Sequence, residues 1–159
     1  MTYMNKKQVN IKKNSSPAKQ SISDTYVEIT GSRGSINTVD SNSKIVYRFG
    51  YNIQIDGTTG TKWFLHIKLQ KSTDSFSSNI TDVEGANYNV SSDQTTATDH
   101  LYRYNTAFFV INGLDGDHEL RLVCRAYSSS LEPQLHQSDY FDGIAETNYT
   151  DTSLIIFEV

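Results

Sequence analysis

The chain has 159 residues, enough for one domain that buries roughly 68–70% of its unfolded surface without a disulfide or a metal. It is 36% hydrophobic, has a formal net charge of −4, and contains ten tyrosines, seven phenylalanines and only two prolines. No run of about 18 apolar residues is present, which argues against a membrane-spanning helix, and the single Cys124 excludes an internal disulfide. The N-terminus lacks an apolar stretch of signal-peptide length, so we do not expect the classical secretory route. Abundant β-branched, aromatic and turn-forming residues predict an all-β fold, an antiparallel β-sandwich.

The charge is unevenly divided along the chain. Residues 1–23 contain five lysines and no acidic residue, a charge of +5, whereas residues 24–159 contain nine basic and 18 acidic residues, a charge of −9. Residues 1–23 also show no sustained periodicity and too few apolar side chains for a core. We therefore predict a basic extended N-terminal arm over residues 1–23 and a β-sandwich domain over residues 24–159.

The arm is predicted to dock on an acidic surface of another protein, because a segment with so few apolar residues needs a partner to hold it. The predicted docking residues are Lys6, Lys7, Lys12, Lys13 and Lys19. Nucleic acid is the rival partner for a basic segment. It is not favoured, because the body is acidic and the arm has no arginine and a single aromatic residue, Tyr3.

The first half of the domain is predicted to contain three strands. Thr25–Thr30 alternates between apolar and polar residues and is predicted to be the first strand. It ends at the glycine-containing stretch that follows. Lys44–Asp56 is the clearest periodic segment of the chain. Six of its side chains fall on one face: Ile45, Tyr47, Phe49, Tyr51, Ile53 and Ile55. The turn at Asp56–Gly60 leads into a return strand at Lys62–Lys71, which makes a long hairpin.

Two further strands follow a long polar stretch. Ser72–Asp99 is predicted to be mostly loop, with a short strand possible near Ala86–Val90, and loops of this length often carry binding function. Leu101–Ile111 begins by alternating and ends apolar on both sides. His118–Tyr127 returns the chain with alternate residues facing the core.

The closing strand, Thr152–Val159, has apolar side chains on both faces. It follows a weaker extended segment at Leu131–Phe141 and a polar loop at Asp142–Asp151. One face of such a strand is covered by the domain's own core, and the other needs a second cover, such as a partner subunit. The predicted subunit interface consists of Phe108, Phe109, Ile111, Leu154, Ile155, Phe157 and Val159.

No residue pattern indicates a catalytic, metal or cofactor site. The four histidines lie on different predicted elements without metal-ligand spacing, and Cys124 falls on a core face, where a thiol is inert. Acidic residues at Asp115, Asp117 and Glu119 are compatible with calcium, but such residues are ordinary in turns. A second acidic stretch contains Asp139, Asp142 and Glu146; paired carboxylates can hydrolyse glycosides, but a solvated loop is the simpler interpretation. We predict a protein that is not an enzyme.

Four aromatic residues are not absorbed by the alternation of core residues: Phe64, Tyr127, Tyr140 and Tyr149. Exposed aromatic rings beside loop carboxylates and amides suit a sugar-binding platform. Tyrosine is equally favoured at protein interfaces. The doubly apolar strands favour the interface interpretation, and the sugar-binding interpretation stays open.

The strand pattern resembles the tumour-necrosis-factor-like jelly roll, which also occurs in complement-type globular heads and in small structural proteins of tailed phages. The resemblance covers roughly residues 25–159. It rests on the long aromatic-rich hairpin Lys44–Lys71, on Leu-Gln-Lys-Ser-Thr-Asp at Leu69–Asp74 before a polar loop, and on the apolar closing strand at Asp151–Val159. It implies a homotrimer with the last strand near the threefold axis, and a virion role as a capsid decoration protein or a fibre tip. The basic arm is not a feature of that family.

We therefore expect a non-enzymatic virion structural protein, a trimeric jelly roll that decorates or cements a bacteriophage capsid and is docked by its basic arm. It would be made in the host cytoplasm, with no cofactor and no membrane or nucleic-acid partner. The alternative is a host-attachment module that binds surface glycans through the predicted Ser72–Asp99 and Asp142–Asp151 loops. A secreted cytokine-like ligand and a polysaccharide hydrolase are weaker alternatives.

Overall fold

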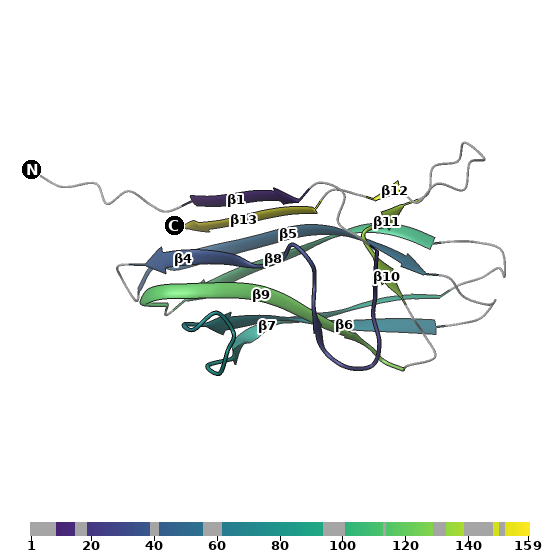
Figure 1. Ribbon diagram of the computed structural model, residues 1–159, viewed down its shortest axis with the longest axis horizontal. Coiled ribbons are helices and arrows are strands. Elements are labelled where there is room, and N and C mark those ends of the chain that lie inside the picture. The colour runs from purple at the N-terminus through teal and green to yellow at the C-terminus, as the bar shows by residue number, and fades with distance from the viewer. Residues whose placement is uncertain are drawn as a thin grey trace, which may run out of the picture.

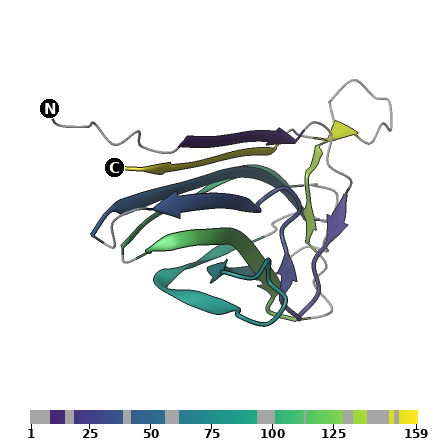
Figure 2. The same ribbon diagram turned by 60° about the vertical axis from the view of Figure 1, so that its left-hand side comes forward.

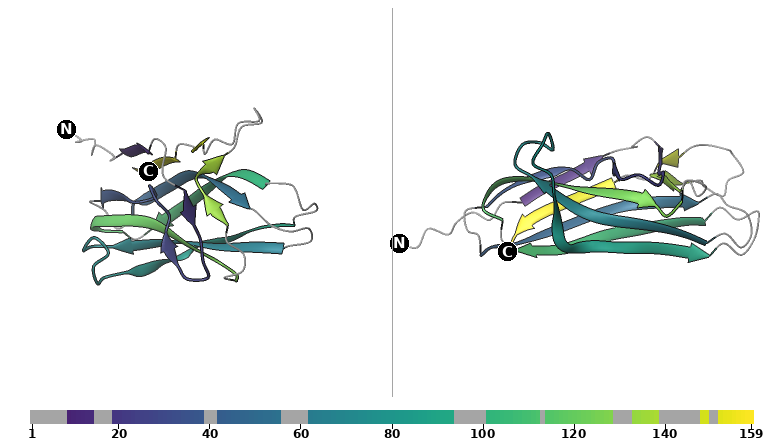
Figure 3. Two further views of the ribbon diagram at one scale, coloured as in Figure 1. Left: turned by 45° about the vertical axis from the view of Figure 1, so that its right-hand side comes forward. Right: turned by 90° about the horizontal axis from the view of Figure 1, so that it is seen from below.

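The protein is an antiparallel β-sandwich (Figure 1). A computed structural model describes residues 9–14, 19–38, 42–55, 62–93, 101–112, 114–128, 133–138, 148–149 and 152–159. These residues form strands, turns and bends but no helix, so the predicted all-β sandwich is confirmed. The described part of the chain accordingly contains no helix that could cross a membrane. Figure 3 shows the two sheets as stacked layers.

The first sheet, which we call sheet A, contains the first and last strands. Its long strands lie in the order β1 (Val9–Asn14), β13 (Thr152–Glu158), β5 (Lys44–Ile55) and β8 (Leu101–Asn112). All neighbours are antiparallel. Beyond the end of β13, two short strands continue the sheet beside β5: β10 (Gln134–Leu135) and β2 (Gln20–Ser21). The first and last strands are therefore adjacent, as Figure 2 shows for β1 and β13.

The second sheet, sheet B, is built around β9. Two short strands pair along one edge of β9 (Gly116–Ala126): β3 (Val27–Glu28) and β4 (Gly34–Thr38). On its other edge lie β6 (Lys62–Ser72) and then β7 (Thr81–Asp93). A separate pair of two-residue strands is formed by β11 (Gln137–Ser138) and β12 (Asn148–Tyr149).

The strand order is that of a jelly roll. Two four-stranded antiparallel sheets, β1-β13-β5-β8 and β4-β9-β6-β7, interleave strands from the whole length of the chain in two Greek keys. Because β1 supplies the outermost strand of sheet A, the jelly roll begins inside the segment predicted to be an arm.

The core lies between the sheets and follows the predicted alternation. The largest fully buried side chains include Tyr47, Tyr51, Phe49, Ile45, Ile53, Leu65, Ile67 and Leu69. Cys124 is also fully buried, and burial raises the pKa of its thiol to about 12. The buried Tyr51 hydroxyl is hydrogen-bonded to the Tyr88 hydroxyl, with the two oxygens 2.8 Å apart. A buried hydroxyl left without a partner would cost about 1–3 kcal/mol.

The N-terminal segment is more integrated than its composition suggests. Residues 9–14 pair with β13 of the same chain, Gln20–Ser21 pair with β10, and Ile22 is fully buried in the core. The described part of the predicted arm is therefore held by the domain itself, and the boundary predicted at residue 23 falls after two strands and one core residue. Backbone hydrogen bonds, which require no apolar side chains, hold β1 in place.

The predicted loop at Ser72–Asp99 is corrected over most of its described length. Only residues 73–80 lie between strands, and Thr81–Asp93 form β7, a strand of 13 residues. Ala86 and Val90 of β7 are buried, whereas its outward positions are polar. The alternation is interrupted near Gly85, which has a φ of 71°, where the register with β6 shifts. This irregularity hides the strand period from a reading of the sequence.

Candidate assembly surface

The outward surface of sheet A carries two parallel rows of large side chains, which we call the β1–β8 face. Paired residues of neighbouring strands point to the same side of a sheet, so the register defines each row. The first row runs across the four strands as Val9, Phe157, Val46 and Val110, and the second as Ile11, Ile155, Arg48 and Phe108. Seven of these eight side chains are apolar.

Much of this apolar surface is open to solvent. The exposed fractions are 60% for Val9, 70% for Ile11, 59% for Phe108 and 51% for Val110. Fully burying a side chain of this kind contributes about 1.5–3 kcal/mol, so completing the burial of each would contribute about 1–2 kcal/mol. Exposed apolar side chains are common singly, but a contiguous group of them marks an interaction surface.

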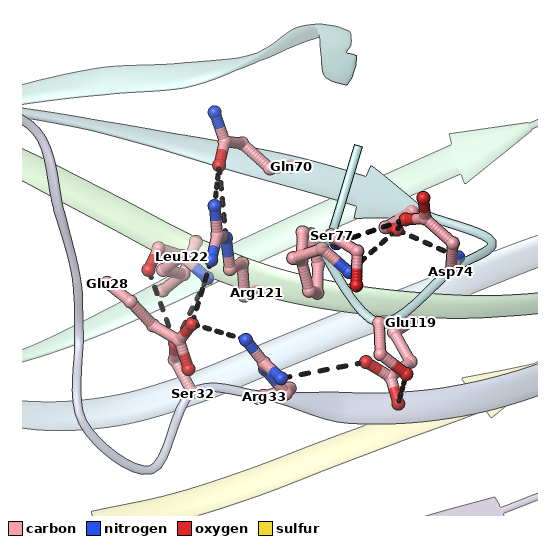
Figure 4. A network of polar contacts seen from close by, with 12 residues as sticks. Glu28, Ser32, Arg33, Gln70, Asp74, Ser77, Glu119, Arg121 and Leu122 are labelled. Atoms are coloured by element: carbon pink, nitrogen blue, oxygen red, sulfur yellow. Dashed lines mark hydrogen bonds and ion pairs between the residues drawn. The ribbon is translucent and has the colours of Figure 1, made fainter. Parts of the chain in front are cut away.

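The surface of sheet B differs, because a network of charged side chains covers part of it (Figure 4). Glu28 accepts hydrogen bonds from Arg33 at 2.9 Å and from Arg121 at 3.0 Å. Arg121 also donates to the side-chain oxygen of Gln70, at 3.1 Å from its Nε. The two guanidinium groups lie 4.8 and 4.1 Å from the centre of the Phe76 ring. Phe76 is buried beneath this network, in which one carboxylate pairs with two guanidinium groups.

The loop that carries Phe76 is held by one carboxylate, Asp74. Its oxygens accept hydrogen bonds from the side chains of Ser78 and Ser72 and from the backbone N–H groups of Ser77, Ser78 and Asn79. These hydrogen bonds hold the pKa of Asp74 well below its usual range. The bond from the Ser78 hydroxyl has the largest effect. The part of the predicted Ser72–Asp99 loop that lies between strands is thus a short, tightly bonded turn.

The predicted interface residues divide between the two surfaces of sheet A. Phe108, Ile155, Phe157 and Val159 point outward, and Val159 is 47% exposed. The other three are corrected: Leu154 and Ile111 are buried in the protomer's own core, and Phe109 packs with its ring 5.9 Å from that of Tyr88. Alternation along a strand sends neighbouring residues to opposite faces, so these three cannot share a surface with Phe108 and Ile155.

Four apolar residues of the face are absent from the predicted interface: Val9, Ile11, Val46 and Val110. A signal for the first two is present as the apolar–polar–apolar pattern at the start of β1, but lysines surround it. Val46 was hidden because its strand reads as one buried face and one polar face. Only the pairing of β1, β13, β5 and β8 brings the four together.

Two of the arm lysines have described side chains, and the one on β1 is paired with the core residue Leu154, on the side of sheet A opposite the β1–β8 face. Lys12, on β1, is exposed and its Nζ lies 3.3 Å from the backbone carbonyl oxygen of Arg33, and Lys19 is exposed. Lys6 and Lys7 lie outside the described residues, as does the side chain of Lys13. Docking of these lysines on an acidic partner remains a prediction.

The turn at Asp115, Asp117 and Glu119 makes contacts within the chain. The Asn37 side chain donates to Asp117, and Glu119 lies 3.9 Å from Arg33. Across the described residues, no group of three histidine, cysteine or acidic side chains is arranged to hold a metal. The acidic stretch at Asp139, Asp142 and Glu146 and the aromatic Tyr140 lie outside the described residues, as does the side chain of Tyr149.

Comparison with known proteins identifies no family. No protein-family model matches the chain, and no curated protein matches it in sequence. Among solved structures, it is similar to a subunit of Bacillus endospore appendages, described as a novel family of disulfide-linked pili, with a TM-score of 0.38 and 13% identity over 100% of this chain and 96% of that one. It is also similar to a chain of the infectious bursal disease virus Gx strain, with a TM-score of 0.41 and 12% identity over 97% of this chain and 37% of that one. At such low scores neither likeness bears on the role of this chain.

Proposed function

We propose that this protein is a non-enzymatic structural protein that associates with further copies of itself through the β1–β8 face. The observation that carries the proposal is the set of exposed apolar side chains on β1 and β8, the two edge strands of this face, with Ile155 and Phe157 half-buried between them. A second copy is the favoured occupant, because Arg48 lies in the second row beside Phe108. Packing of two copies would bring an Arg48 guanidinium over a neighbour's Phe108 ring, a favourable cation–π arrangement.

The finer form of the proposal is a homotrimer that decorates or cements a phage capsid. It is supported by the resemblance of Leu69–Asp74 and of the closing strand to small structural proteins of tailed phages. The arm lysines would hold an acidic shell surface in a salt-dependent way, and three arms on one trimer would add avidity without further contacts.

Self-association is tested by measuring the mass of the purified protein with light scattering over a range of concentrations. The double variant Ile11→Ser and Phe108→Ser removes one exposed side chain from each edge strand of the face. The two substitutions together would remove about 2–4 kcal/mol of binding free energy from each interface between copies, which would weaken association by about 30- to 1,000-fold. Ile80→Ser is the matched control, because Ile80 is also exposed, at 40%, but precedes β7 on the other sheet. A wild-type protein that stays a single chain at every concentration would contradict the proposal.

Docking of the arm needs a separate test, because deleting residues 1–23 would also remove β1 and Ile22 from the fold. Replacing Lys12 and Lys19 with glutamine leaves the β1 backbone pairing intact. We expect this variant to form the same assembly and to bind shells more weakly, with a smaller dependence on salt. Full shell occupancy by the variant would contradict docking and leave self-association unaffected.

A further inference from the structure

A second surface, on sheet B, gathers aromatic and basic side chains from three strands or strand ends. Arg125 of β9, His66 of β6 and Asn89 of β7 are paired across the strands in one row. Two residues further along their strands lie Phe64 and Tyr127, and the Tyr127 backbone N–H donates to the Phe64 carbonyl oxygen at 3.0 Å. The register therefore puts two aromatic side chains directly beside a row of hydrogen-bonding groups.

Tyr26, just before β3, completes this cluster. Its hydroxyl is hydrogen-bonded to Nδ1 of His66, and its ring centre lies 4.2 Å from the Nζ of Lys68 and 5.1 Å from the Cζ of Arg125. Lys68 is neutralised by Asp82, with the charged atoms 2.7 Å apart. Arg125 is exposed and forms no ion pair with any residue that the structure describes. Its positive charge stays available in a chain whose net charge is −4.

The cluster surrounds an open cleft of about 230 Å³, which is lined by Tyr26, Phe64, His66, Asn89, Arg125, Ala126 and Tyr127. Phe64 is 44% exposed and Tyr127 is 81% exposed, and their ring centres lie 6.1 Å apart with the planes at 68°. The volume is below the roughly 300–1,000 Å³ of pockets that enclose drug-sized ligands. The cleft suits one small ring whose remaining substituents extend into water.

The chemistry of the cleft distinguishes among occupants. A specific protein interface takes about 20–30 residues on each side, whereas seven residues line this cleft. Nucleic acid stacks on aromatic rings but needs a positively charged groove along its backbone, and the body of this protein is acidic. A sugar ring has an apolar face for an aromatic side chain and polar edges for Asn89. A carboxylate on that sugar would match the Arg125 guanidinium.

We propose that this cleft binds an acidic saccharide, with the sugar ring against Phe64 and Tyr127 and its carboxylate on Arg125. Tyr26, hydrogen-bonded to His66, positions Arg125 through the cation–π contact with its ring. This site lies on the opposite sheet from the β1–β8 face, so it is independent of self-association. Repetition of the site in an assembly would raise the avidity for a surface that carries many such sugars.

The test measures binding of defined saccharides to the full chain by amide chemical shifts in nuclear magnetic resonance. Trigalacturonate and sialyllactose carry the carboxylate on different sugars, lactose is the neutral control, and oligothymidylate tests for nucleic acid. We expect shifts at Phe64, Asn89 and Tyr127 with one or both acidic saccharides, and binding at least tenfold weaker to lactose. Arg125→Gln and Tyr127→Ala should each weaken binding about tenfold or more, whereas Arg103→Gln, an exposed arginine on β8, should not.

Binding of only one of the two acidic saccharides would support the site and show which acidic sugar it recognises. Equal binding of lactose, no binding of either acid at millimolar concentration, or preferential binding of oligothymidylate would each overturn the proposal. The Ile11→Ser and Phe108→Ser double variant should keep its saccharide binding. That result separates failure of this site from failure of the assembly face.

Discussion

His136 makes the stability of this protein depend on pH between about 6.5 and 4. It lies between β10 and β11, it is fully buried, and neither of its ring nitrogens has a hydrogen-bond partner among the described residues. Its backbone N–H donates to the Asn52 carbonyl oxygen at 2.9 Å, and its φ of 70° is uncommon for a residue other than glycine. The imidazole is therefore fixed at a buried position where nothing described compensates its charged form.

Burial lowers the pKa of His136 from its ordinary value of about 6.5 to about 4. As the pH falls through 6.5, the unfolded chain takes up a proton at this residue and the folded chain does not. The unfolded state is favoured increasingly until the pH reaches about 4, where the folded state also becomes protonated. The difference corresponds to about 3 kcal/mol at or below pH 4, and to about 2–3 kcal/mol at pH 4.5.

The assay is urea unfolding, followed by circular dichroism at pH values between 7.5 and 4.5. His136→Asn is the comparison variant, because asparagine carries no titrating group and tolerates a positive φ. We expect the wild type to lose about 2–3 kcal/mol between pH 7.5 and 4.5 relative to the variant. Asp74 and Asp82, whose pKa values are lowered, lose their stabilising effect only as the pH falls below about 4, outside this window. Parallel stability curves for the two proteins would refute the reasoning.

Three further predictions concern packing and the loop. Leu154→Ala should lower the free energy of unfolding by about 2–5 kcal/mol in urea titration, because Leu154 is 1% exposed in the core; a loss under 1 kcal/mol would contradict its inward placement. Gly34→Ala should cost about 1–3 kcal/mol in the same assay, since the new Cβ would lie 2.7 Å from Cδ1 of Ile156, and adding Ile156→Val should restore part of the loss. Asp74→Asn should accelerate amide hydrogen exchange at Ser77–Asn79, which donate to that carboxylate; unchanged rates would show that the loop holds without it.

The long central strands could be predicted from the sequence because their signal is local. In Lys44–Ile55 and Lys62–Ser72, every second side chain must be apolar to fill the core, and that requirement is visible within about ten residues. The same alternation explains why Leu154 and Ile155 face opposite ways. For this closing strand, which is apolar on both faces, alternation alone does not indicate which set of side chains faces the domain's own core.

The edge strands could not be predicted in this way. β1 and β7 each bury few side chains, and their main stabilising contacts are backbone hydrogen bonds to β13 and β6, which leave little trace in composition. The lysine-rich start of the chain therefore resembles a free arm, although it contains a strand of sheet A.

An all-β domain, a core of alternating apolar residues and a final strand with two apolar faces follow from the order of the residues along the chain. Which surfaces arise follows from the fold, because strand pairing joins residues far apart in the chain. Val9 meets Phe157 across one pair of strands, and Arg125 meets His66 across another. Register fixes these neighbours through backbone hydrogen bonds, and the backbone groups that form them are the same at nearly every residue.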